Sequence, residues 1–414
     1  MPPPAITVDV LVVGAGVVGA ATAYELARRG VDVAVVDAGP GIGSGCSHAN
    51  AGLLAPEHVE PLTTPANIWT GLRSLPRRDS PFHITPSARI VPWLARFAAA
   101  SRPERARALT RTMRALSRRS LGMHREYAAA GLDTGFRQDG SLDVFLTADR
   151  FAAAVRRLGG RHHDGVRVLD ADAARAVEPG LGDIAGAIMH GEDATCETRA
   201  FARACLRAAE ERGARVHWNT DVPGLRTVAG RVVGAHTGLG PVAAGAVVVA
   251  AGLASNALTA RLGVRLPLLG GKGYVVDVPP QGRPALPLTF AELKVVATPY
   301  PDRLRLCGTM DLGDPGDRLV ASRVTAIRRA ARRGLPAVDT SRPVQVWAGQ
   351  RPCTADGIPV IGPSSRVPGL HVATGHGMWG LILAPATAVA VADGIAGVPG
   401  DADLAVFSPD RFGS

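Results

Sequence analysis

Cysteine is scarce and scattered in this chain of 414 residues. The five cysteines show no CxxC spacing: they are Cys46, Cys196, Cys205, Cys307 and Cys353. This pattern excludes a disulfide framework and a cysteine-based zinc site, and it favours a reducing, cytoplasmic location. His162 and His163 lie in a polar segment with no third ligand nearby in sequence, so we expect no metal site.

Long hydrophobic runs are also missing. The first residues, Met-Pro-Pro-Pro-Ala-Ile, lack the basic and apolar segments of a signal peptide. The uncharged stretch 242–260 contains Gly245, Gly252 and Ser255, which favours a buried strand and a turn over a membrane span. The sequence therefore predicts no transmembrane segment, and only peripheral membrane contact remains open.

Aromatic residues form only 4% of the chain, although the formal net charge is +10. Arginines gather between Arg102 and Arg125, with Leu109, Met113 and Leu116 among them at roughly helical spacing. This spacing favours an amphipathic helix with a solvated basic face, and a docking surface for anionic lipid, an acidic redox partner or RNA is the alternative. Because aromatic side chains are not interleaved with these arginines, a stacking surface is missing and nucleic acid is not expected as a partner.

What the chain does contain, near its N-terminus, is a complete β-α-β pattern over residues 8–37. An apolar strand runs into the turn of Gly14, Gly16 and Gly19, and a second apolar strand ends at Asp37. Such glycines let backbone N–H groups approach a pyrophosphate and point a helix N-terminus toward it. The carboxylate of Asp37 would lie where a ribose hydroxyl is expected. The pattern predicts a dinucleotide-binding domain.

A second glycine-rich turn lies more than 300 residues later, at 375–385. It also opens an apolar helix, whose partial positive N-terminal charge would face another electron-rich group of the same cofactor. A dinucleotide that carries a flavin ring is long enough to need both turns.

The hydrophobic periodicity divides the chain into two interleaved units. Alternation of apolar and polar residues over 264–347 predicts an antiparallel sheet with one covered face. We expect an α/β fold in which a Rossmann-type FAD-binding domain is interleaved with an α+β substrate domain built on that antiparallel sheet. The expected division gives residues 1–56, 193–262 and 345–414 to the FAD-binding domain, and 57–192 and 263–344 to the substrate-binding domain.

Several motifs, taken together, resemble the FAD-dependent amine and amino-acid oxidising flavoproteins of the D-amino-acid oxidase fold, especially the D-amino-acid dehydrogenase and glycine oxidase branches. The resemblance runs nearly end to end and in the order of the family. It rests on the N-terminal glycine turn, Ser47-His-Ala-Asn-Ala-Gly-Leu53, 247–255, Lys272-Gly-Tyr274, 303–309, Gly349-Gln-Arg-Pro352, 356–359 and 375–386.

The resemblance implies that FAD is bound along the first domain. The ADP half would lie against the first turn and the ends of neighbouring strands, at Gly14, Gly16, Val17, Val18, Gly19, Asp37, Ala38, Val222, Ala251 and Gly252. The phosphates and the flavin ring would be bordered by Ser47, Asn50, Ala51, Gly52 and Leu53. The pyrimidine end would be covered by Gly375, His376, Gly377, Met378, Trp379, Gly380 and Leu381.

Two positions depart from the family pattern. Asp37 stands where these flavoproteins usually carry glutamate. Cys353 follows Arg351 by only two residues, out of register with the cysteine that binds flavin covalently in the sarcosine oxidase branch. We therefore expect FAD to be bound non-covalently.

Arg351 is the expected substrate anchor, because a guanidinium can bind a planar carboxylate through two N–H donors. Tyr274 would donate a hydroxyl to the same carboxylate or pack against the ring. His376 would contact the flavin or the substrate amine, or serve only its turn. Trp379 would wall the pocket or pack in the core, and Asn50 completes the set of candidate catalytic residues.

The resemblance implies oxidation of the C–N bond of an amino acid or a related amine acid, by hydride transfer from the α-carbon to flavin N5, followed by hydrolysis of the imine. One alternative is oxidation of a secondary amine, such as an N-substituted glycine, a cyclic imino acid or a specialised metabolite. Others are a tRNA-modifying flavin enzyme and a Rossmann protein that binds NAD. The electron acceptor, which could be oxygen or a quinone or other redox partner, stays open, as do the stereochemistry and the oligomeric state.

Overall fold

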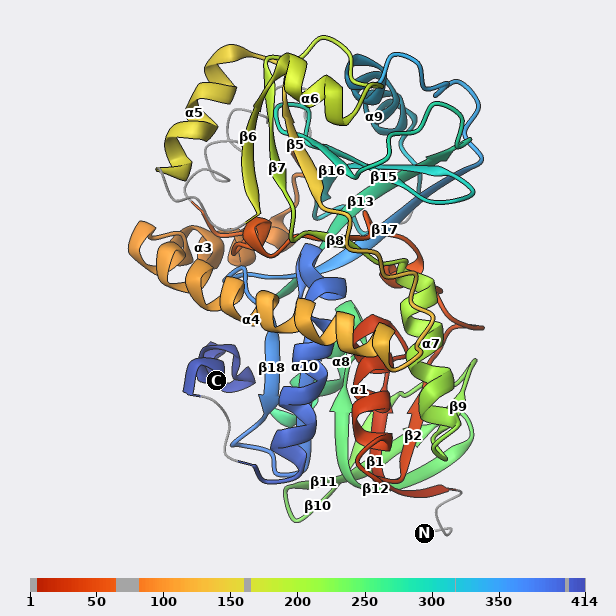
Figure 1. Cartoon of the computed structure of the whole chain (residues 1–414). Helices are drawn as coiled ribbons and strands as arrows, with labels where there is room; N and C mark the ends of the chain where they lie inside the picture. The colour runs from red at the N-terminus through yellow and green to blue at the C-terminus, as the bar shows by residue number, and fades with distance from the viewer. Residues whose placement is uncertain (1–5, 65–81, 160–164, 317, 399–401, 414) are drawn as a thin grey trace.

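The computed structural model describes residues 6–64, 82–159, 165–316, 318–398 and 402–413, and two β-sheets stacked end to end organise them (Figure 1). The first sheet contains Ile6–Val13 (β1), Val33–Val36 (β2), Arg215–His217 (β9), Gly224–Val228 (β10), Arg231–Thr237 (β11), Gly240–Val249 (β12), Val360–Pro363 (β18) and Leu370–Thr374 (β19). Their order is β10-β11-β12-β1-β2-β9, with β19 beside β12 and β18 beside β19.

The centre of the first sheet is parallel. Strands β9, β2, β1, β12 and β19 all run in one direction, so their carboxyl ends meet at one edge. The β1 residues Val10, Leu11, Val12 and Val13 are all buried, because both faces of the sheet are covered. The predicted α/β fold is confirmed, and the edge where the strands end is the place where such sheets bind ligands.

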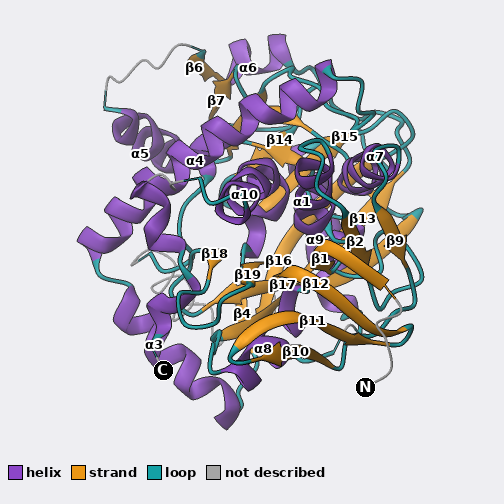
Figure 2. Ribbon diagram, turned by 90° about the horizontal axis from the view of Figure 1, so that it is seen from below, coloured by secondary structure: helices purple, strands orange, loops and turns teal. Residues whose placement is uncertain are grey.

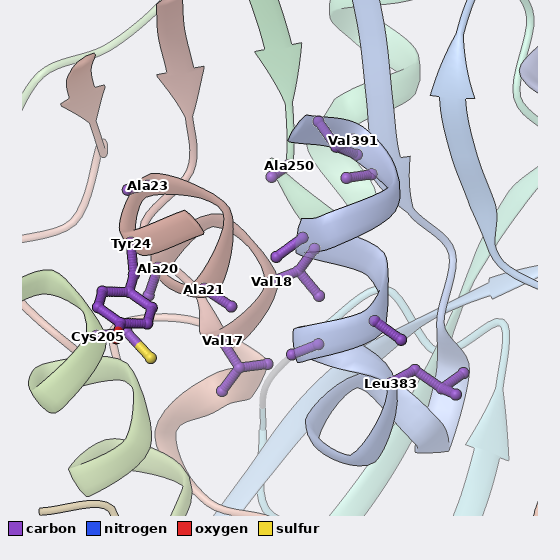
Figure 3. Close-up of a cluster of buried hydrophobic side chains, with 14 of the residues drawn as sticks. Val17, Val18, Ala20, Ala21, Ala23, Tyr24, Cys205, Ala250, Leu383 and Val391 are labelled. Atoms are coloured by element: carbon purple, nitrogen blue, oxygen red, sulfur yellow. The ribbon is translucent and has the colours of Figure 1, made fainter. Parts of the chain in front are cut away.

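Three helices lie side by side over one face of this sheet, as the view from below shows (Figure 2). They are Val17–Ala27 (α1), Thr198–Glu210 (α7) and Gly380–Ile395 (α10). Helix α1 lies between the other two, with Val18 toward Leu383 and Val391 of α10 and Tyr24 toward α7 (Figure 3). Its small buried residues, Ala20 and Ala21, let the neighbouring helices approach closely.

The second sheet is mostly antiparallel, with the order β17-β13-β16-β15-β14-β5-β7-β6 and with β4 beside β16. Its strands are Phe82–Ile84 (β4), Ser141–Phe145 (β5), Val166–Asp170 (β6), Gly186–His190 (β7), Leu268–Val278 (β13), Leu288–Phe290 (β14), Val295–Pro299 (β15), Leu304–Leu312 (β16) and Gln345–Thr354 (β17). Strand β17 pairs with β13 in this sheet, although the division expected from the sequence assigns residues 345–354 to the other unit.

The register of the second sheet aligns one row of residues across four strands. Cys307 of β16 is opposite Val296 of β15, Val296 is opposite Thr289 of β14, and Thr289 is opposite Asp143 of β5. Residues directly opposite one another point to the same face. Thr289, Val296 and Cys307 of this row line one cavity, so the row defines the face of the sheet that borders it. Helix Ala321–Gly334 (α9) packs on β13, β15 and β16.

The basic segment of the sequence forms one long helix, Pro103–Ala129 (α4). Leu109, Met113 and Leu116 are buried, as the amphipathic interpretation predicts. Part of the basic face is paired within the chain, since Arg114 and Arg118 both contact the carboxylate of Glu57.

Helix α4 also compensates for a proline inside α10. Pro385 has no N–H, so the carbonyl of Leu381 lacks its helical donor. The Nε2 atom of buried His124 lies 3.0 Å from that carbonyl oxygen, and the Ser120 hydroxyl accepts from the N–H of Ala386 at 3.2 Å. Two side chains of α4 thus satisfy backbone groups next to the proline.

The apolar segment Gly377–Ile395 is long and apolar enough to cross a membrane, but 61% of its most apolar window is buried inside the protein. Its packing against α1 and α4 accounts for that composition. The remaining elements are Leu53–Leu54 (β3), paired with Ala194–Thr195 (β8), and the helices Val91–Ala100 (α3), Ala148–Leu158 (α5), Ala171–Val177 (α6) and Ser255–Thr259 (α8). Short 3₁₀ turns lie at Cys46–His48, Pro56–His58, Ala88–Ile90, Gly252–Ala254, Ala260–Leu262, Gly377–Trp379, Ala402–Phe407 and Pro409–Phe412.

Candidate functional site

The turn between β1 and α1 requires glycine at two of its three positions. Gly14 has φ +105°, and a Cβ there would lie 2.5 Å from the carbonyl oxygen of Ala250 at the end of β12. A Cβ on Gly19 would lie 1.9 Å from the carbonyl oxygen of Gly14. Two backbone segments therefore approach more closely than any side chain permits, and the turn is held tightly against the end of the neighbouring strand.

Gly16 has a different environment. The nearest atom to a Cβ at this position is the Ser47 hydroxyl oxygen, at 3.0 Å, and no backbone of another described segment lies within 4 Å. The same hydroxyl accepts from the N–H of Val17 at 3.1 Å, in the first turn of α1. Protein packing does not demand glycine here, but an anionic group approaching the helix N-terminus would. The cradle fits a pyrophosphate.

Asp37 ends β2 beside this turn. One carboxylate oxygen accepts from the N–H of Ala15 at 2.7 Å and the other from the N–H of Gly39 at 2.8 Å. Each carboxylate oxygen has a second acceptor position, so a ribose hydroxyl can still donate to it. The adjacent Ala38 is exposed.

The other residues predicted to hold the dinucleotide lie near the same edge of the first sheet. Ala251 and Gly252 come directly after β12, and Val222 lies beyond β9. Gly252 has φ +56°, and a Cβ there would meet no atom within 4 Å. The Thr374 hydroxyl, at the end of β19, donates to the Gly252 carbonyl at 2.9 Å, which joins two strand ends.

A cavity of about 1110 Å³ lies between this edge and the second sheet. It is bordered by residues 50–53, 378 and 379 on one side and by β14, β15 and β16 on another, while Phe82, Trp93 and Phe97 supply an apolar wall. Arg351 also lines it. The structure thus brings together the predicted substrate anchor and predicted flavin neighbours, namely Asn50, Ala51, Gly52, Leu53, Met378 and Trp379.

The Arg351 guanidinium lies across the backbone of the second sheet. A Cβ on Gly273 would be 2.1 Å from its Nη2 atom, so any larger residue at this position in β13 would displace the guanidinium. The Nη1 atom donates to the carbonyl oxygen of Thr309 in β16 at 3.4 Å. A guanidinium has five N–H donors, and the hydrogen bond to Thr309 uses one of them. Arg351 lines the cavity with this group.

Asn50 and Trp379 are fixed by hydrogen bonds at the edge of the cavity. The Asn50 side-chain oxygen accepts from the N–H of Gly52 at 2.8 Å and from the Thr198 hydroxyl at 2.5 Å. The indole N–H of Trp379 donates to the Glu60 carbonyl at 2.8 Å, so its ring forms a wall.

Tyr274 is absent from the residues that line this cavity. It is fully buried in the core of the second sheet, and its hydroxyl donates to Asp311 at 2.9 Å. Burial and the neighbouring Asp311 carboxylate raise the pKa of Tyr274. The structure therefore assigns it a packing position, away from a carboxylate held by Arg351.

His376 belongs to the glycine turn before α10 and is also absent from the lining of the large cavity. Its Nε2 atom lies 3.0 Å from the Thr387 hydroxyl in α10, and burial lowers the pKa of His376 to about 3. A neutral ring bound to its own helix is a structural contact. Gly375 has φ +76°, and a Cβ there would lie 2.5 Å from the Thr354 side chain, so the turn itself needs glycine. Gly377 and Gly380 follow in the same turn, before Leu381.

Sequence reasoning missed a charged group at the other end of the cavity. His58 lines it, and its Nε2 atom lies 3.0 Å from an Asp143 oxygen that also lies 3.2 Å from Nε2 of His190. Burial alone would lower the pKa of His58, but the Asp143 carboxylate raises it to about 9. His58, Asp143 and His190 each offer one atom that could bind a metal ion, and these three atoms lie within 4.8 Å of one another. The sequence carries no local signal for this cluster, because its members are 47 or more residues apart. His162 and His163 lie outside the described residues.

Comparisons with known proteins agree with this arrangement. A family model described as FAD dependent oxidoreductase (DAO) matches residues 9–394. The chain is similar to D-amino acid dehydrogenase 2 of Ralstonia nicotianae, with 36% identity over 94% of this chain and 96% of the relative. It is also similar to D-amino acid dehydrogenase of Paramagnetospirillum magneticum, with 34% identity over 98% of this chain and 99% of the relative.

Solved structures have the same fold. Glycine oxidase from Geobacillus kaustophilus is 28% identical, with a TM-score of 0.75 over 98% of this chain and 99% of that one. Glycine oxidase from Bacillus cereus is 24% identical, with a TM-score of 0.76 over 95% of this chain and 96% of that one.

Proposed function

The chain belongs to the DAO family of FAD-dependent oxidoreductases, and we propose that it oxidises the C–N bond of a D-amino acid or a related amine acid. The family resemblance predicted from the sequence is confirmed, and FAD is the cofactor of the family. The preference for a D-amino acid is supported by relatives named D-amino acid dehydrogenase, which match over nearly their whole length.

The observation that carries the proposal is Arg351 on the wall of the cavity. A planar α-carboxylate can accept two parallel N–H bonds from a guanidinium, which fixes the orientation of the α-carbon as well as its position. Apolar side chains such as Trp93 and Met310 keep water away from the rest of the substrate. Little acid–base machinery is needed in the protein.

When bound, FAD supplies the two-electron acceptor for this chemistry. The residues of this chain then have separable tasks. The N-terminus of α1, with Gly16 and Ser47, would hold the pyrophosphate, and Asp37 would accept from a ribose hydroxyl. The turn before α10 would place partial positive charge at the pyrimidine end, which favours electron transfer toward it. Arg351 would orient the amino acid.

Replacing Arg351 with alanine tests this assignment. We expect Arg351→Ala to retain FAD but to be reduced by amino acids at least about a hundredfold less efficiently, because a charged bidentate contact contributes about 3 kcal/mol. Flavin bleaching without oxygen measures this directly. Arg351→Lys keeps the charge but loses the paired N–H donors, so its efficiency of reduction should lie between those of the parent and Arg351→Ala. Reduction of Arg351→Ala as readily as the parent would remove the anchoring role.

The same assay identifies the substrate and the acceptor. D-amino acids, L-amino acids, glycine derivatives and cyclic imino acids are compared without oxygen, and air is then admitted. Rapid recovery of the oxidised spectrum supports oxygen as the acceptor, whereas slow recovery supports a quinone or another redox partner.

Non-covalent binding of FAD is part of the proposal. Cys353 is buried against Gly271 in the second sheet, where a Cβ on that glycine would lie 2.9 Å from its sulfur. We expect the yellow colour to leave the polypeptide on acid precipitation. A coloured pellet would show a covalent bond, and peptide mapping would then locate it.

A further inference from the structure

Thr309 has an unusual backbone conformation on the cavity wall. Its φ is +59°, in the left-handed region, although it lies inside strand β16. Threonine is branched at Cβ, so this conformation is strained, whereas glycine adopts it without strain. The neighbouring position 308 is glycine, yet the strained position is not.

The strain belongs to a bulge in the pairing of β13 and β16. Gly308 is opposite Tyr274 and Asp311 is opposite Lys272, so residues 309 and 310 together are opposite Gly273 alone. Bulges of this kind bend a strand and redirect a side chain, and they are frequent beside active sites. Here the strand positions on both sides of the bulge serve one group, because Gly273 makes room for the Arg351 guanidinium and the Thr309 carbonyl accepts from it.

Among the described residues, no hydrogen bond of the Thr309 side chain offsets this strain. Thr309 lines the cavity, and among the described residues its buried hydroxyl makes no hydrogen bond. A buried hydroxyl without a partner is costly and calls for an explanation. If the bulge served only the backbone, glycine would be the better residue.

We propose that Thr309 is a substrate-binding residue, whose hydroxyl donates to the carboxylate that Arg351 binds. This inference rests on the proposed function and deepens it, since the site would recognise carboxylates through two side chains. A carboxylate has four lone-pair positions, of which a guanidinium uses two. The hydroxyl can take a third, and the hydrogen bond from Arg351 to the Thr309 carbonyl places this residue beside the guanidinium.

The test compares two variants that differ by one oxygen atom. Thr309→Ser and Thr309→Ala both remove the branching at Cβ, but only serine keeps the hydroxyl. The probe is propionate, which has a carboxylate and no amine, and its binding to the oxidised holoenzyme is followed by the change in flavin absorbance. We expect Thr309→Ser to bind propionate within about threefold of the parent and Thr309→Ala about tenfold more weakly than Thr309→Ser.

Propionamide provides the chemical control, because it has nearly the same shape and no charge. Its affinity should be the same in Thr309→Ser and Thr309→Ala to within about threefold, since a neutral hydrogen bond contributes less. A general disturbance of the cavity would weaken both ligands equally and would overturn the proposal.

A third variant separates backbone strain from binding. Thr309→Gly should melt at a higher temperature than Thr309→Ala, because it removes the strain, but it should bind propionate as weakly. Ala229→Gly is the matched control: Ala229 has φ +48° in an exposed turn between β10 and β11. This variant should also gain thermal stability, with no change in propionate affinity.

The outcomes distinguish this inference from the proposed function. Equal propionate affinities in Thr309→Ser and Thr309→Ala, together with weaker binding in Arg351→Ala, would overturn only the role of Thr309. Equal affinities in the parent and Arg351→Ala would overturn the carboxylate site as a whole.

Discussion

The edge of the first sheet and the wall formed by the second sheet build their binding surfaces in different ways. At the first edge the binding surface is formed by the backbone. Gly14 and Gly19 permit close approach of neighbouring backbone segments, and Gly16 leaves space before the N–H groups of α1. On the second sheet, the surface consists of side chains that separate strands place together, such as Arg351 from β17 and Thr309 from β16. The first surface is local in sequence, and the second depends on strand register.

This difference predicts that substitutions at the first edge separate folding from binding. Gly19→Ala should destabilise the protein by at least about 3 kcal/mol, because its Cβ would lie 1.9 Å from the Gly14 carbonyl oxygen and neither backbone segment can move freely. Gly16→Ala should cost less than about 1 kcal/mol, since only the Ser47 hydroxyl is close, but it should lose FAD. Urea unfolding of the apoprotein and the ratio of FAD to protein measure the two effects. A stable Gly16→Ala variant with full FAD content would contradict the pyrophosphate cradle.

On the second sheet, a glycine should matter for binding alone. Gly273→Ala would bring a Cβ to within 2.1–2.5 Å of the Arg351 guanidinium nitrogens and displace that flexible side chain. We expect reduction by substrate to fall about a hundredfold, with FAD content preserved. The control is the double variant Gly273→Ala with Arg351→Ala, which should be no worse than Arg351→Ala alone, because the two changes act through the same group. Additive losses would show that Gly273 acts separately.

Substitutions at His124 and Pro385 test whether the first region also depends on side chains from distant parts of the sequence. The glycines of that region alone would suggest that it does not. His124→Phe should destabilise the protein by about 1–3 kcal/mol, because the Leu381 carbonyl then has no donor. Pro385→Ala restores a helical N–H, so the double variant should recover part of that loss. Urea unfolding of the single and double variants gives the coupling. If the two effects simply add, the histidine does not compensate for the proline.

The same contrast explains what sequence could predict. The residues from Gly14 to Asp37 belong to one continuous segment, so their spacing alone predicts the strand, turn, helix and strand that the structure contains. For Tyr274 the sequence leaves a carboxylate ligand and a packing residue both open, because neighbouring residues of a strand point to opposite faces and the motif does not say which face is which. It is buried against Asp311, while its neighbour Gly273 faces the guanidinium. Only the register of β13 and β17 decides this, and it joins distant residues: Tyr274 and its partner Ala348 are 74 positions apart.

Thr309, His58 and Asp143 were missed for the same reason. The bulge at Thr309 is defined by its pairing with β13, and nothing in the local sequence indicates a positive φ at a threonine. His58 and Asp143 meet only because β5 lies in the second sheet beside β14, in line with the row from Cys307. Arg351 could be predicted as a candidate although it lies on this sheet, since its motif resembles that of a known family, and it lines the cavity.

The pair of His58 and Asp143 gives the smallest expected effect. It tests whether a charge on the second sheet also stabilises the first region, because it links β5 to the segment that follows residues 50–53. Burial opposes the charge on His58, but Asp143 raises its pKa to about 9, above the ordinary value of 6.5. The pair therefore stabilises the folded state fully below about pH 6.5, and this contribution is lost as the pH rises through 9. We expect a loss of about 1 kcal/mol across this window, since His58 is partly open to the cavity.

Asp143→Asn should be less stable than the parent at pH 6 and equal to it above pH 9, whereas a change at the exposed His236 should leave the profile unaltered. A parent and an Asp143→Asn variant whose urea midpoints differ equally at both pH values would show that the carboxylate acts through packing, and that charge on the second sheet does not couple the two regions.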